Sequence, residues 1–399
     1  MPSHRIKGKM ASISEEDEVS FREKGTDGLH SFILQRKENW KSNPLRIAVT
    51  GNSGVGKSSL INAFLGLKPN APGAAAVGIT ETTMQVKAYP HPNNENFVLY
   101  DLPGVGTQLF RRKCYLKKVD FNKYDFFLIL SATRFTENEA WLARRANEQQ
   151  KKFFFVRTKI DIDMENEKDD SGENFNQEKS LQNIKEDVER NLQGLNANVY
   201  LITTRLCRIN QFECTRLIDD LTESTPQLKT EALVLHLSTL TESVLLEKTK
   251  LLSRRSGLLT DTIEALAPVH SCRESIAVND SYLELEASFY RQQLHLDSNS
   301  LGNMRRTYGL DTEKLNLKSR KINFNTQGIL DACCPTELRE KERGFLKGLT
   351  RTVVNVLLPS IATNKRLKRF DATLQNLLNI LRTDAMEVNK AIIAEILGT

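Results

Sequence analysis

The sequence predicts an α/β fold with a mostly parallel sheet and helices on both of its faces, followed by an all-helical region. Short apolar runs alternate with helical segments between residues 45 and 202, which is typical of βαβ units. A glycine-rich turn separates the first apolar run from the first of these helices. Beyond about residue 226 the strand signal fades, and apolar residues recur at helical spacing, as at Leu374, Leu377, Leu378 and Leu381.

The individual elements follow from the order of these runs. Leu45 to Thr50 predicts the first strand, and Ser58 to Leu65 predicts a helix after the glycine-rich turn. Four further strands are expected at Phe97–Tyr100, Tyr124–Leu130, Phe153–Val156 and Val199–Ile202. We therefore expect four regions: a polar tail over residues 1–26, an N-terminal helix within residues 27–44, the α/β domain over residues 45–226 and a helical domain over residues 227–399.

The composition is that of a soluble globular chain with a small excess of positive charge. Hydrophobic residues make up 39% of the 399 residues, and the net charge of +6 falls short of a dedicated nucleic-acid binder. No apolar run is long enough to span a bilayer, and the N-terminus lacks the apolar segment of a signal peptide. The six cysteines lack zinc-site spacing, which favours a reduced, cytoplasmic chain. Adjacent Cys333 and Cys334 are expected to be small buried residues, with lipidation as the alternative.

One motif carries the chemistry most clearly. Residues Gly51, Asn52, Ser53, Gly54, Val55, Gly56, Lys57 and Ser58 match the phosphate-binding pattern G-x-x-x-x-G-K-[ST] in full, between a predicted strand and a predicted helix. The glycines allow main-chain amides to turn towards phosphate oxygens, and the helix N-terminus adds partial positive charge. Lys57 is expected to neutralise phosphate charge, the Ser58 hydroxyl to coordinate Mg²⁺, and Ser59 to lie beside them in the same site.

Two further motifs narrow the range of ligands that the site is expected to bind. Asp101 ends a predicted strand, where its carboxylate can hold Mg²⁺ through a water, and Gly104 allows a close main-chain approach to the terminal phosphate. Thr158, Lys159 and Asp161 form a T-K-x-D motif after another strand. The Asp161 carboxylate can accept from both donors on the guanine edge, which adenine lacks, so guanine is the expected base. Thr203 and Thr204 follow the last strand and are weaker candidates for contacting the base.

The segment between the phosphate-binding loop and Asp101 has the features of a nucleotide-ordered switch. Thr83 is expected to coordinate Mg²⁺ when the terminal phosphate orders this segment, with Thr82 as the alternative. Val105 stands where many small GTPases place a glutamine that orients water, so another group must assist hydrolysis. Glu81 is a candidate for that role and Arg134 a weaker one, while an ordinary surface charge is the competing interpretation for both.

Taken together, these segments resemble the immunity-related GTPases, an interferon-inducible family. The resemblance rests on GNSGVGKSSLINAFLG (51–66), GAAAVGITETTM (73–84), YDLPGVGT (100–107), YDFFLILSATRF (124–135), FFFVRTKID (153–161) and VYLITTRLCRINQFECTRLIDDL (199–221). It implies a P-loop, Ras-like G domain beside one helical domain built from the N-terminal helix and the C-terminal half. Lys57 places the chain in the subclass with a standard G-K-S loop, which implies an effector type.

The resemblance also implies partners and a location. It implies GTP-dependent self-association through the nucleotide face, with activation on assembly, and recruitment from the cytoplasm to intracellular membranes such as vacuoles, the endoplasmic reticulum or the Golgi. Pro2 excludes the N-myristoylation that some members use. The segment Phe345–Arg369, with Lys365, Arg366, Lys368 and Arg369, is the candidate for binding membrane lipids, and a buried bundle helix is the competing interpretation.

The leading hypothesis is therefore a Mg²⁺-dependent enzyme that hydrolyses GTP to GDP and phosphate in cell-autonomous innate immune defence. The alternative is a nucleotide-gated switch or scaffold with negligible turnover. A ribosome- or RNA-associated GTPase is disfavoured, because the charge excess is small and no RNA-binding signature follows the α/β domain. We expect no nucleic-acid partner.

Overall fold

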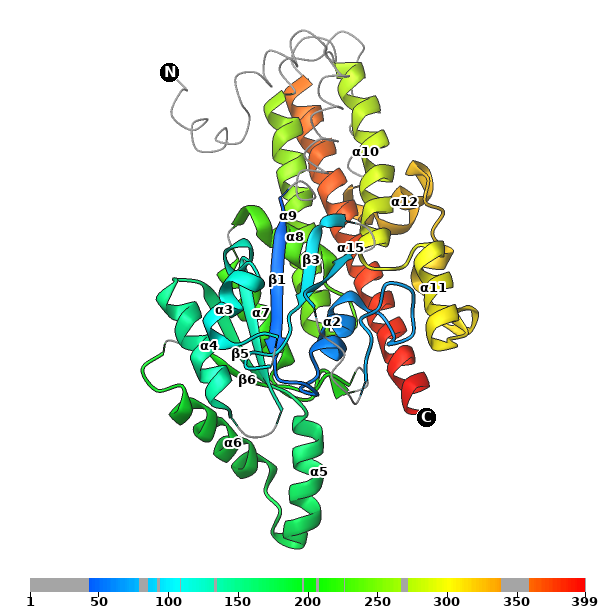
Figure 1. Cartoon of the computed structure of the whole chain (residues 1–399). Helices are drawn as coiled ribbons and strands as arrows, with labels where there is room; N and C mark the ends of the chain where they lie inside the picture. Colours follow the sequence, from blue (N-terminus) through cyan, green and yellow to red (C-terminus); the bar gives the residue numbers. More distant parts are fainter. Residues whose placement is uncertain are drawn as a thin grey trace, which may run out of the picture. The chain divides into compact units, whose positions relative to one another are not determined.

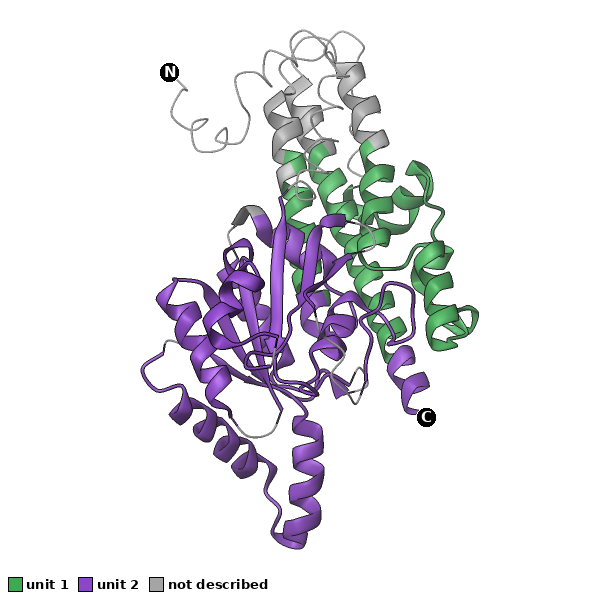
Figure 2. Cartoon of the chain, in the orientation of Figure 1, with its two compact units in different colours: residues 1–39, 245–390 green, residues 40–244, 391–399 purple. Residues whose placement is uncertain are grey.

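The computed structural model describes residues 43–78, 85–91, 94–107, 109–132, 135–195, 197–205, 208–225, 227–266, 272–338 and 359–398. The chain divides into two compact units (Figure 2). The α/β unit comprises residues 40–244 and 391–399, and the helical unit comprises residues 1–39 and 245–390. The limits expected from the sequence differ from these units chiefly at residues 227–244, and they stay a prediction. The expected tail and nearly all of the expected N-terminal helix lie outside the described residues.

The α/β unit contains a six-stranded sheet with strand order β2-β3-β1-β4-β5-β6 (Figure 1). All five predicted strands are present, and β1, β3, β4, β5 and β6 run parallel to their neighbours in this group. The parallel direction brings the carboxyl ends of these five strands to one edge of the sheet. The strands span Leu45–Gly51 (β1), Lys87–His91 (β2), Asn94–Asp101 (β3), Phe126–Ser131 (β4), Lys152–Arg157 (β5) and Val199–Leu201 (β6).

Helices cover both faces of this sheet, as predicted. Alternate residues of each strand point to opposite faces, so Ile47 and Leu128 join one apolar cluster while Ala48 and Phe127 join the other. Side chains of α2, α7 and α8 belong to the first cluster, and side chains of α3, α4, α5 and α6 belong to the second. These helices span Lys57–Leu65 (α2), Arg112–Lys118 (α3), Glu137–Glu148 (α4), Ile160–Ser171 (α5), Gln177–Asn191 (α6), Cys214–Ser224 (α7) and Gln227–His236 (α8), with short 3₁₀ turns at Phe121–Lys123 (η1) and Gly172–Asn174 (η2).

The sequence did not predict β2. This edge strand pairs antiparallel with β3, and its register shifts between Pro90 and His91. None of its five residues is buried, so it lacks the alternation of apolar and polar residues that marks a half-buried strand. Pro90 also removes one main-chain donor, which restricts such a segment to the edge of a sheet.

The helical unit is all helical in its described part, as predicted beyond residue 226. Its helices span Glu242–Leu266 (α9, which begins in the last residues of the α/β unit), Cys272–Gln293 (α10), Ser298–Tyr308 (α11), Thr326–Cys333 (α12) and Pro359–Leu397 (α15, which ends in the α/β unit), with 3₁₀ turns at Thr312–Lys314 (η5) and Lys318–Lys321 (η6). Among the described helices, none combines the length and the apolar character that a bilayer span requires.

Buried polar contacts tie the helices of this unit together. The Arg255 Nε atom lies 3.1 Å from the Glu286 carboxylate, which is almost fully buried. The Asp384 carboxylate accepts from the main-chain amide of Ser319 at 2.7 Å. Cys333 and Cys334 are both buried, with exposed fractions of 3% and 6%. They are therefore the small buried residues expected from the sequence.

Candidate functional site

The phosphate-binding loop lies between β1 and α2 at the carboxyl edge of the sheet. Gly51, Gly54 and Gly56 have φ angles of 144°, 77° and 91°, which non-glycine residues rarely adopt. A Cβ atom on Gly51 would stand 2.2 Å from the Leu130 carbonyl oxygen, so β4 leaves no room for a side chain there. Ser53 and Gly54 are exposed at the tip of the loop, whereas Val55 is buried in the core beneath it. The base of the loop is thus fixed by the core, and the tip of the loop is exposed.

The Lys57 ammonium group is held at the mouth of this loop. Its Nζ atom donates to the carbonyl oxygens of Gly51 at 3.1 Å and Asn52 at 3.0 Å. The Lys57 side chain is buried, although a lysine is rarely buried unless its charge is compensated. The loop therefore holds a positive charge at the N-terminus of α2, where an anion is favoured by the helix dipole as well.

A hydroxyl and a carboxylate meet beside this lysine. The Ser58 Oγ atom donates to Asp101 Oδ2 at 3.2 Å, and Asp101 ends β3 next to Val49 of β1. The Asp101 side chain is buried. Both groups offer the oxygen ligands that Mg²⁺ prefers, directly or through water. The two predicted metal ligands of the described chain are therefore close enough to share one ion.

The D-x-x-G turn packs directly against the phosphate-binding loop. A Cβ atom on Gly104 would stand 3.2 Å from the Gly51 carbonyl oxygen and 3.6 Å from the Asn52 Cα atom. The Tyr115 hydroxyl of α3 lies 3.0 Å from the Pro103 carbonyl oxygen, to which it donates, and 3.0 Å from the Thr50 hydroxyl. Burial raises the pKa of this hydroxyl, so it stays protonated and able to donate. Tyr115 is a supporting residue that the sequence did not reveal.

Val105 follows Gly104, and its side chain does not face the phosphate-binding loop. Its side chain is buried in the apolar cluster beneath α3 and α4. Its carbonyl oxygen accepts from Asn138 Nδ2 at 2.9 Å. Val105 is therefore part of the core, and the expectation that it has no part in orienting water stays a prediction.

The T-K-x-D motif joins the phosphate-binding loop through Thr158. The Thr158 Oγ1 atom donates to the Val55 carbonyl oxygen at 2.6 Å and lies 3.2 Å from the Ser131 carbonyl oxygen. Lys159 adopts a left-handed conformation with φ of 61° and precedes the first turn of α5, where Asp161 is buried. The motif is therefore anchored to the loop by a hydrogen bond, rather than merely lying near it.

The loop after β6 completes this end of the site. The Arg205 Nε atom lies 3.1 Å from Asp161 Oδ2, and the Thr203 Oγ1 atom accepts from the Arg205 amide at 3.2 Å. The Thr204 hydroxyl lies 3.6 Å from the position of a Cβ atom on Gly56. The structure therefore brings Thr203, Thr204 and Asp161 together with the phosphate-binding loop. Arg205 was not anticipated, although it follows Thr204 directly in the sequence.

A buried carboxylate supports the loop from the other side. The Asn52 Nδ2 atom donates to Glu139 Oε1 at 3.1 Å and to Thr136 Oγ1 at 3.2 Å. Glu139 and Thr136 form a capping box at the start of α4. Burial raises the pKa of the Glu139 carboxyl, and hydrogen bonds from Thr136 oppose the rise. The spacing of Thr136 and Glu139 could have predicted the helix start, but nothing in the sequence links Glu139 to Asn52.

Several expected site residues cannot be placed. Glu81, Thr82, Thr83 and Arg134 lie outside the described residues, and their roles stay predictions. The same holds for most of the segment Phe345–Arg369. Ser59 is half-buried in the first turn of α2, beside the two residues that approach the phosphate and metal positions. The other expected site residues lie within the described ranges, and they come together at the carboxyl edge of the sheet.

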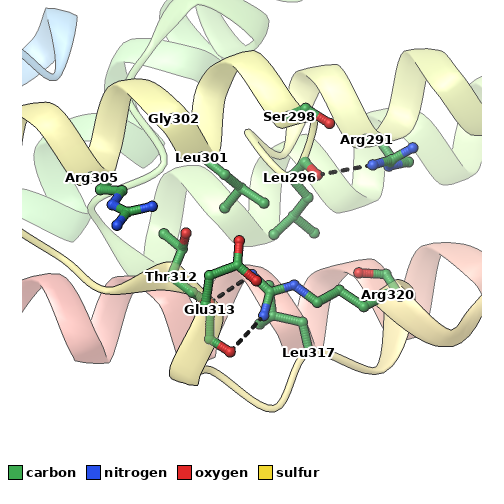
Figure 3. A pocket seen from close by; sticks show the side chains of 11 residues that line it. Arg291, Leu296, Ser298, Leu301, Gly302, Arg305, Thr312, Glu313, Leu317 and Arg320 are labelled. Carbon is green, nitrogen blue, oxygen red and sulfur yellow. Dashed lines mark hydrogen bonds between the residues drawn. The ribbon is translucent and has the colours of Figure 1, made fainter.

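The helical unit contains a cavity of its own, and its lining differs from that of the site described above. This cavity of about 270 Å³ is lined by Arg291, Arg305 and Arg320 among other residues (Figure 3). The Arg320 guanidinium donates to the carbonyl oxygens of Thr312, Glu313 and Leu315, and the Arg291 guanidinium lies over the Phe324 ring at 4.1 Å. Two of the three arginines that line the cavity, Arg320 and Arg291, are therefore engaged in contacts within the protein itself. For this reason we assign no ligand to this cavity.

Known proteins resemble the chain over most of its length. A family model described as interferon-inducible GTPase matches residues 12–388. Interferon-gamma-inducible GTPase 10 of Mus musculus is 40% identical over 281 residues, which cover 68% of this chain and 65% of the mouse protein. The mouse T-cell-specific guanine nucleotide triphosphate-binding protein 2 is 36% identical over 73% of this chain and 70% of its own length. The mouse interferon-inducible GTPase 1 is 32% identical over 75% of this chain and 72% of its own length.

Proposed function

Because the chain belongs to the interferon-inducible GTPase family, we propose that it binds GTP together with Mg²⁺ and hydrolyses the nucleotide to GDP and phosphate. One observation carries the proposal. Phosphate, metal and base motifs from four separate parts of the sequence converge at the carboxyl ends of the parallel strands of one sheet. Ligands of open α/β sheets bind at this edge.

The phosphate end of the site works through charge and main-chain donors. The amides of residues 52–58 and the Lys57 ammonium group surround the β- and γ-phosphates, and the dipole of α2 adds to the attraction. Bound Mg²⁺ neutralises charge that develops on the phosphate oxygens. Ser58 and Asp101, which lie in hydrogen-bond contact, hold this ion together with Thr83. Gly104 allows its amide to approach the γ-phosphate without a side chain in the way.

The base end of the site selects guanine. The buried Asp161 carboxylate accepts from the N1–H and 2-amino groups of the base, and the Lys159 stem covers the base plane. Thr203 and Thr204 border the same space. The Arg205 Nε atom lies 3.1 Å from Asp161 Oδ2, and this buried oxygen has no hydrogen-bond partner among the described residues. An adenine nucleotide would leave this buried carboxylate without its donors, which disfavours ATP strongly.

Hydrolysis requires a group that orients the attacking water, and Val105 cannot supply it. We assign this role to Glu81, with Arg134 as a second candidate, and expect that self-association through the nucleotide face brings the group into position. Single-turnover GTP hydrolysis at rising protein concentration tests the proposal, with Lys57→Ala as the blank. A rate that climbs with concentration supports assembly-driven hydrolysis. A flat and negligible rate in a chain that binds GTP supports the switch or scaffold instead.

The family also suggests where the protein acts. We propose peripheral association of a cytoplasmic protein with intracellular membranes, in cell-autonomous defence, through the basic segment that ends at Arg369. Flotation with anionic liposomes tests this part, comparing the unchanged chain with charge reversal of Lys365, Arg366, Lys368 and Arg369. Unchanged flotation of the variant would remove the basic segment from the proposal.

A further inference from the structure

A buried arginine lies directly beside the T-K-x-D motif and has no part in the roles assigned above. Arg157 is the last residue of β5, and its side chain is 7% exposed. An arginine is almost never buried unless its charge is paired. The Arg157 Nη2 atom donates to Asp163 Oδ2 at 2.7 Å, and its Nη1 atom lies 3.4 Å from the Thr158 carbonyl oxygen. The guanidinium therefore contacts the chain both before and after Asp161.

The charge of this arginine is compensated inside the α/β unit. Burial lowers the pKa of the Arg157 guanidinium, and the charges of Asp163, Glu139 and Asp187 oppose this effect. Glu139 is the buried carboxylate that accepts from Asn52 of the phosphate-binding loop. Removing one partner of a buried ion pair leaves an uncompensated charge, which is strongly unfavourable. The contact between Arg157 and Asp163 is therefore held firmly in the folded protein.

Helix α5 begins without the usual side-chain cap. Its N-cap residue, Lys159, makes no capping hydrogen bond, because a lysine side chain has no acceptor. The apolar side chains of Ile160 and Met164 are buried under the first turn, whereas most of the helix beyond it is exposed. Apolar burial is not directional. The ion pair of Arg157 with Asp163 adds a directional contact to the same turn.

The first turn of α5 carries two carboxylates whose arginine neighbours differ. Asp161 lies 3.1 Å from the Nε atom of Arg205, whose side chain is 51% exposed. Asp163 is paired with the buried Arg157. An exposed side chain changes rotamer readily when a ligand arrives, whereas a buried one is held by close packing. Asp161 is thus able to receive a base, while Asp163 attaches the same turn to the interior.

We propose that Arg157 is a positioning residue for guanine selection, which binds Asp163 and thereby holds the Asp161 carboxylate where both donors of the guanine edge reach it. The inference rests on the proposed function, in which Asp161 accepts from the N1–H and 2-amino groups. Hydrogen bonds weaken steeply as their angles depart from linearity, so two bonds to one carboxylate require its alignment. Loss of the ion pair should therefore weaken binding of guanine more than binding of a base that offers one of these donors.

Hypoxanthine is the base that separates these effects. It keeps the N1–H group and the O6 atom of guanine but lacks the 2-amino group, so inosine diphosphate (IDP) differs from GDP at the base edge alone. The unchanged chain should bind GDP at least about tenfold more tightly than IDP. A variant that merely weakens the whole site lowers both affinities equally. The ratio of the two dissociation constants therefore reports the alignment of Asp161.

Two variants break the ion pair in the full chain. Arg157→Met removes the cation, and Asp163→Asn removes the negative charge while keeping the size of a side chain that is 24% exposed. The second variant is therefore expected to fold even where the first does not. In calorimetric titrations with Mg²⁺, each should bind GDP about tenfold more weakly, and the preference for GDP over IDP should fall at least about threefold.

A matched control on the same helix is Glu165→Gln. Glu165 also pairs with an arginine, Arg208, but the Glu165 side chain is 50% exposed. Exposed ion pairs contribute little, so this variant should bind GDP and IDP like the unchanged chain. A fall in the preference for GDP that is as large in Glu165→Gln as in Asp163→Asn overturns the proposal, since any loss of charge on α5 would then suffice.

Circular dichroism verifies that each variant is folded. An unaltered preference for GDP over IDP in Asp163→Asn overturns the positioning role. Equal losses of affinity for the two nucleotides overturn it as well, because they would assign the ion pair to stability alone. A different result bears on the proposed function: an unchanged chain that binds neither nucleotide, or binds both equally, refutes the guanine site itself.

Discussion

Replacing Lys248 by methionine should stabilise the helical unit. Lys248 lies in α9 with its side chain fully buried, and its Nζ atom donates to the Gln293 carbonyl oxygen at 3.2 Å. Burial lowers the pKa of its ammonium group from 10.5 to about 7. A lysine that is charged in the unfolded chain up to pH 10.5 must therefore lose its proton, or be buried as a cation, when the unit folds.

The size of this cost follows from the pKa difference. At about 1.36 kcal/mol per pKa unit, the difference costs up to about 5 kcal/mol near neutral pH. Methionine keeps the length of the side chain but leaves the Gln293 carbonyl oxygen without this donor, which costs about 1–3 kcal/mol. The first effect is larger, so Lys248→Met should raise the free energy of unfolding by about 1–4 kcal/mol at pH 7.

The pH dependence has a definite sign. Between pH 7 and 10.5 the unfolded chain binds more protons at Lys248 than the folded chain does, so the stability of the unchanged protein rises with pH. From pH 7 to pH 9 it should gain about 2 kcal/mol relative to Lys248→Met. Urea unfolding followed by circular dichroism measures both values. The exposed Lys250, on the same helix, gives the control Lys250→Met, which should follow the unchanged protein at both pH values.

The result that would refute this reasoning is a variant that is less stable at pH 7, or one whose stability difference does not change with pH. Either result would mean that Lys248 is charged and well compensated in the folded state. His295 is the neighbouring group to consider, since burial and the Lys248 charge lower its pKa from 6.5 to about 3. It titrates below the chosen range and does not obscure the measurement.

Three further substitutions test the site. Asp161→Asn should weaken GTP binding by about a hundredfold or more while improving binding of a xanthine nucleotide, because the amide donates where the carboxylate accepts; a competition assay with both nucleotides measures this. Gly104→Ala should slow GTP hydrolysis by about tenfold, since its Cβ atom would stand 3.2 Å from the Gly51 carbonyl oxygen, whereas Gly257→Ala in α9, with open space around it, should leave turnover unchanged. Thr158→Val should cost about 1–3 kcal/mol of stability and weaken nucleotide binding, because Val55 loses the 2.6 Å hydrogen bond; unaltered GDP affinity by fluorescence titration would show that this bond does not position the loop.

Much of this site could be anticipated because its chemistry lies in short contiguous motifs. The phosphate-binding loop needs glycines, a lysine and a serine at fixed spacing after a strand, and that pattern is visible in the sequence. The five parallel strands were equally accessible, because both of their faces are buried and they appear as apolar runs. The hydrogen bond from Thr158 to the Val55 carbonyl oxygen could not be predicted from the sequence, because it depends on how distant segments pack.

The supporting residues were missed for the same reason. Tyr115 reaches Pro103, and Glu139 reaches Asn52, across 12 and 87 positions of the chain. Neither residue belongs to a recognisable motif for these contacts. Strand β2 was missed because its exposed residues do not alternate in polarity. The residues of the short motifs could therefore be predicted from the sequence. The contacts that hold these residues in place could be identified only from the fold.

The central claim is that one site, built from the loop at Lys57 and the carboxylate of Asp161, selects a guanine nucleotide. Isothermal titration calorimetry of the full chain with GTP and with ATP, each in the presence of Mg²⁺, tests it most directly. GTP should bind at least about a hundredfold more tightly than ATP, and Lys57→Ala should abolish most of that binding. Equal affinities for the two nucleotides, or no heat of binding with either, would contradict the account.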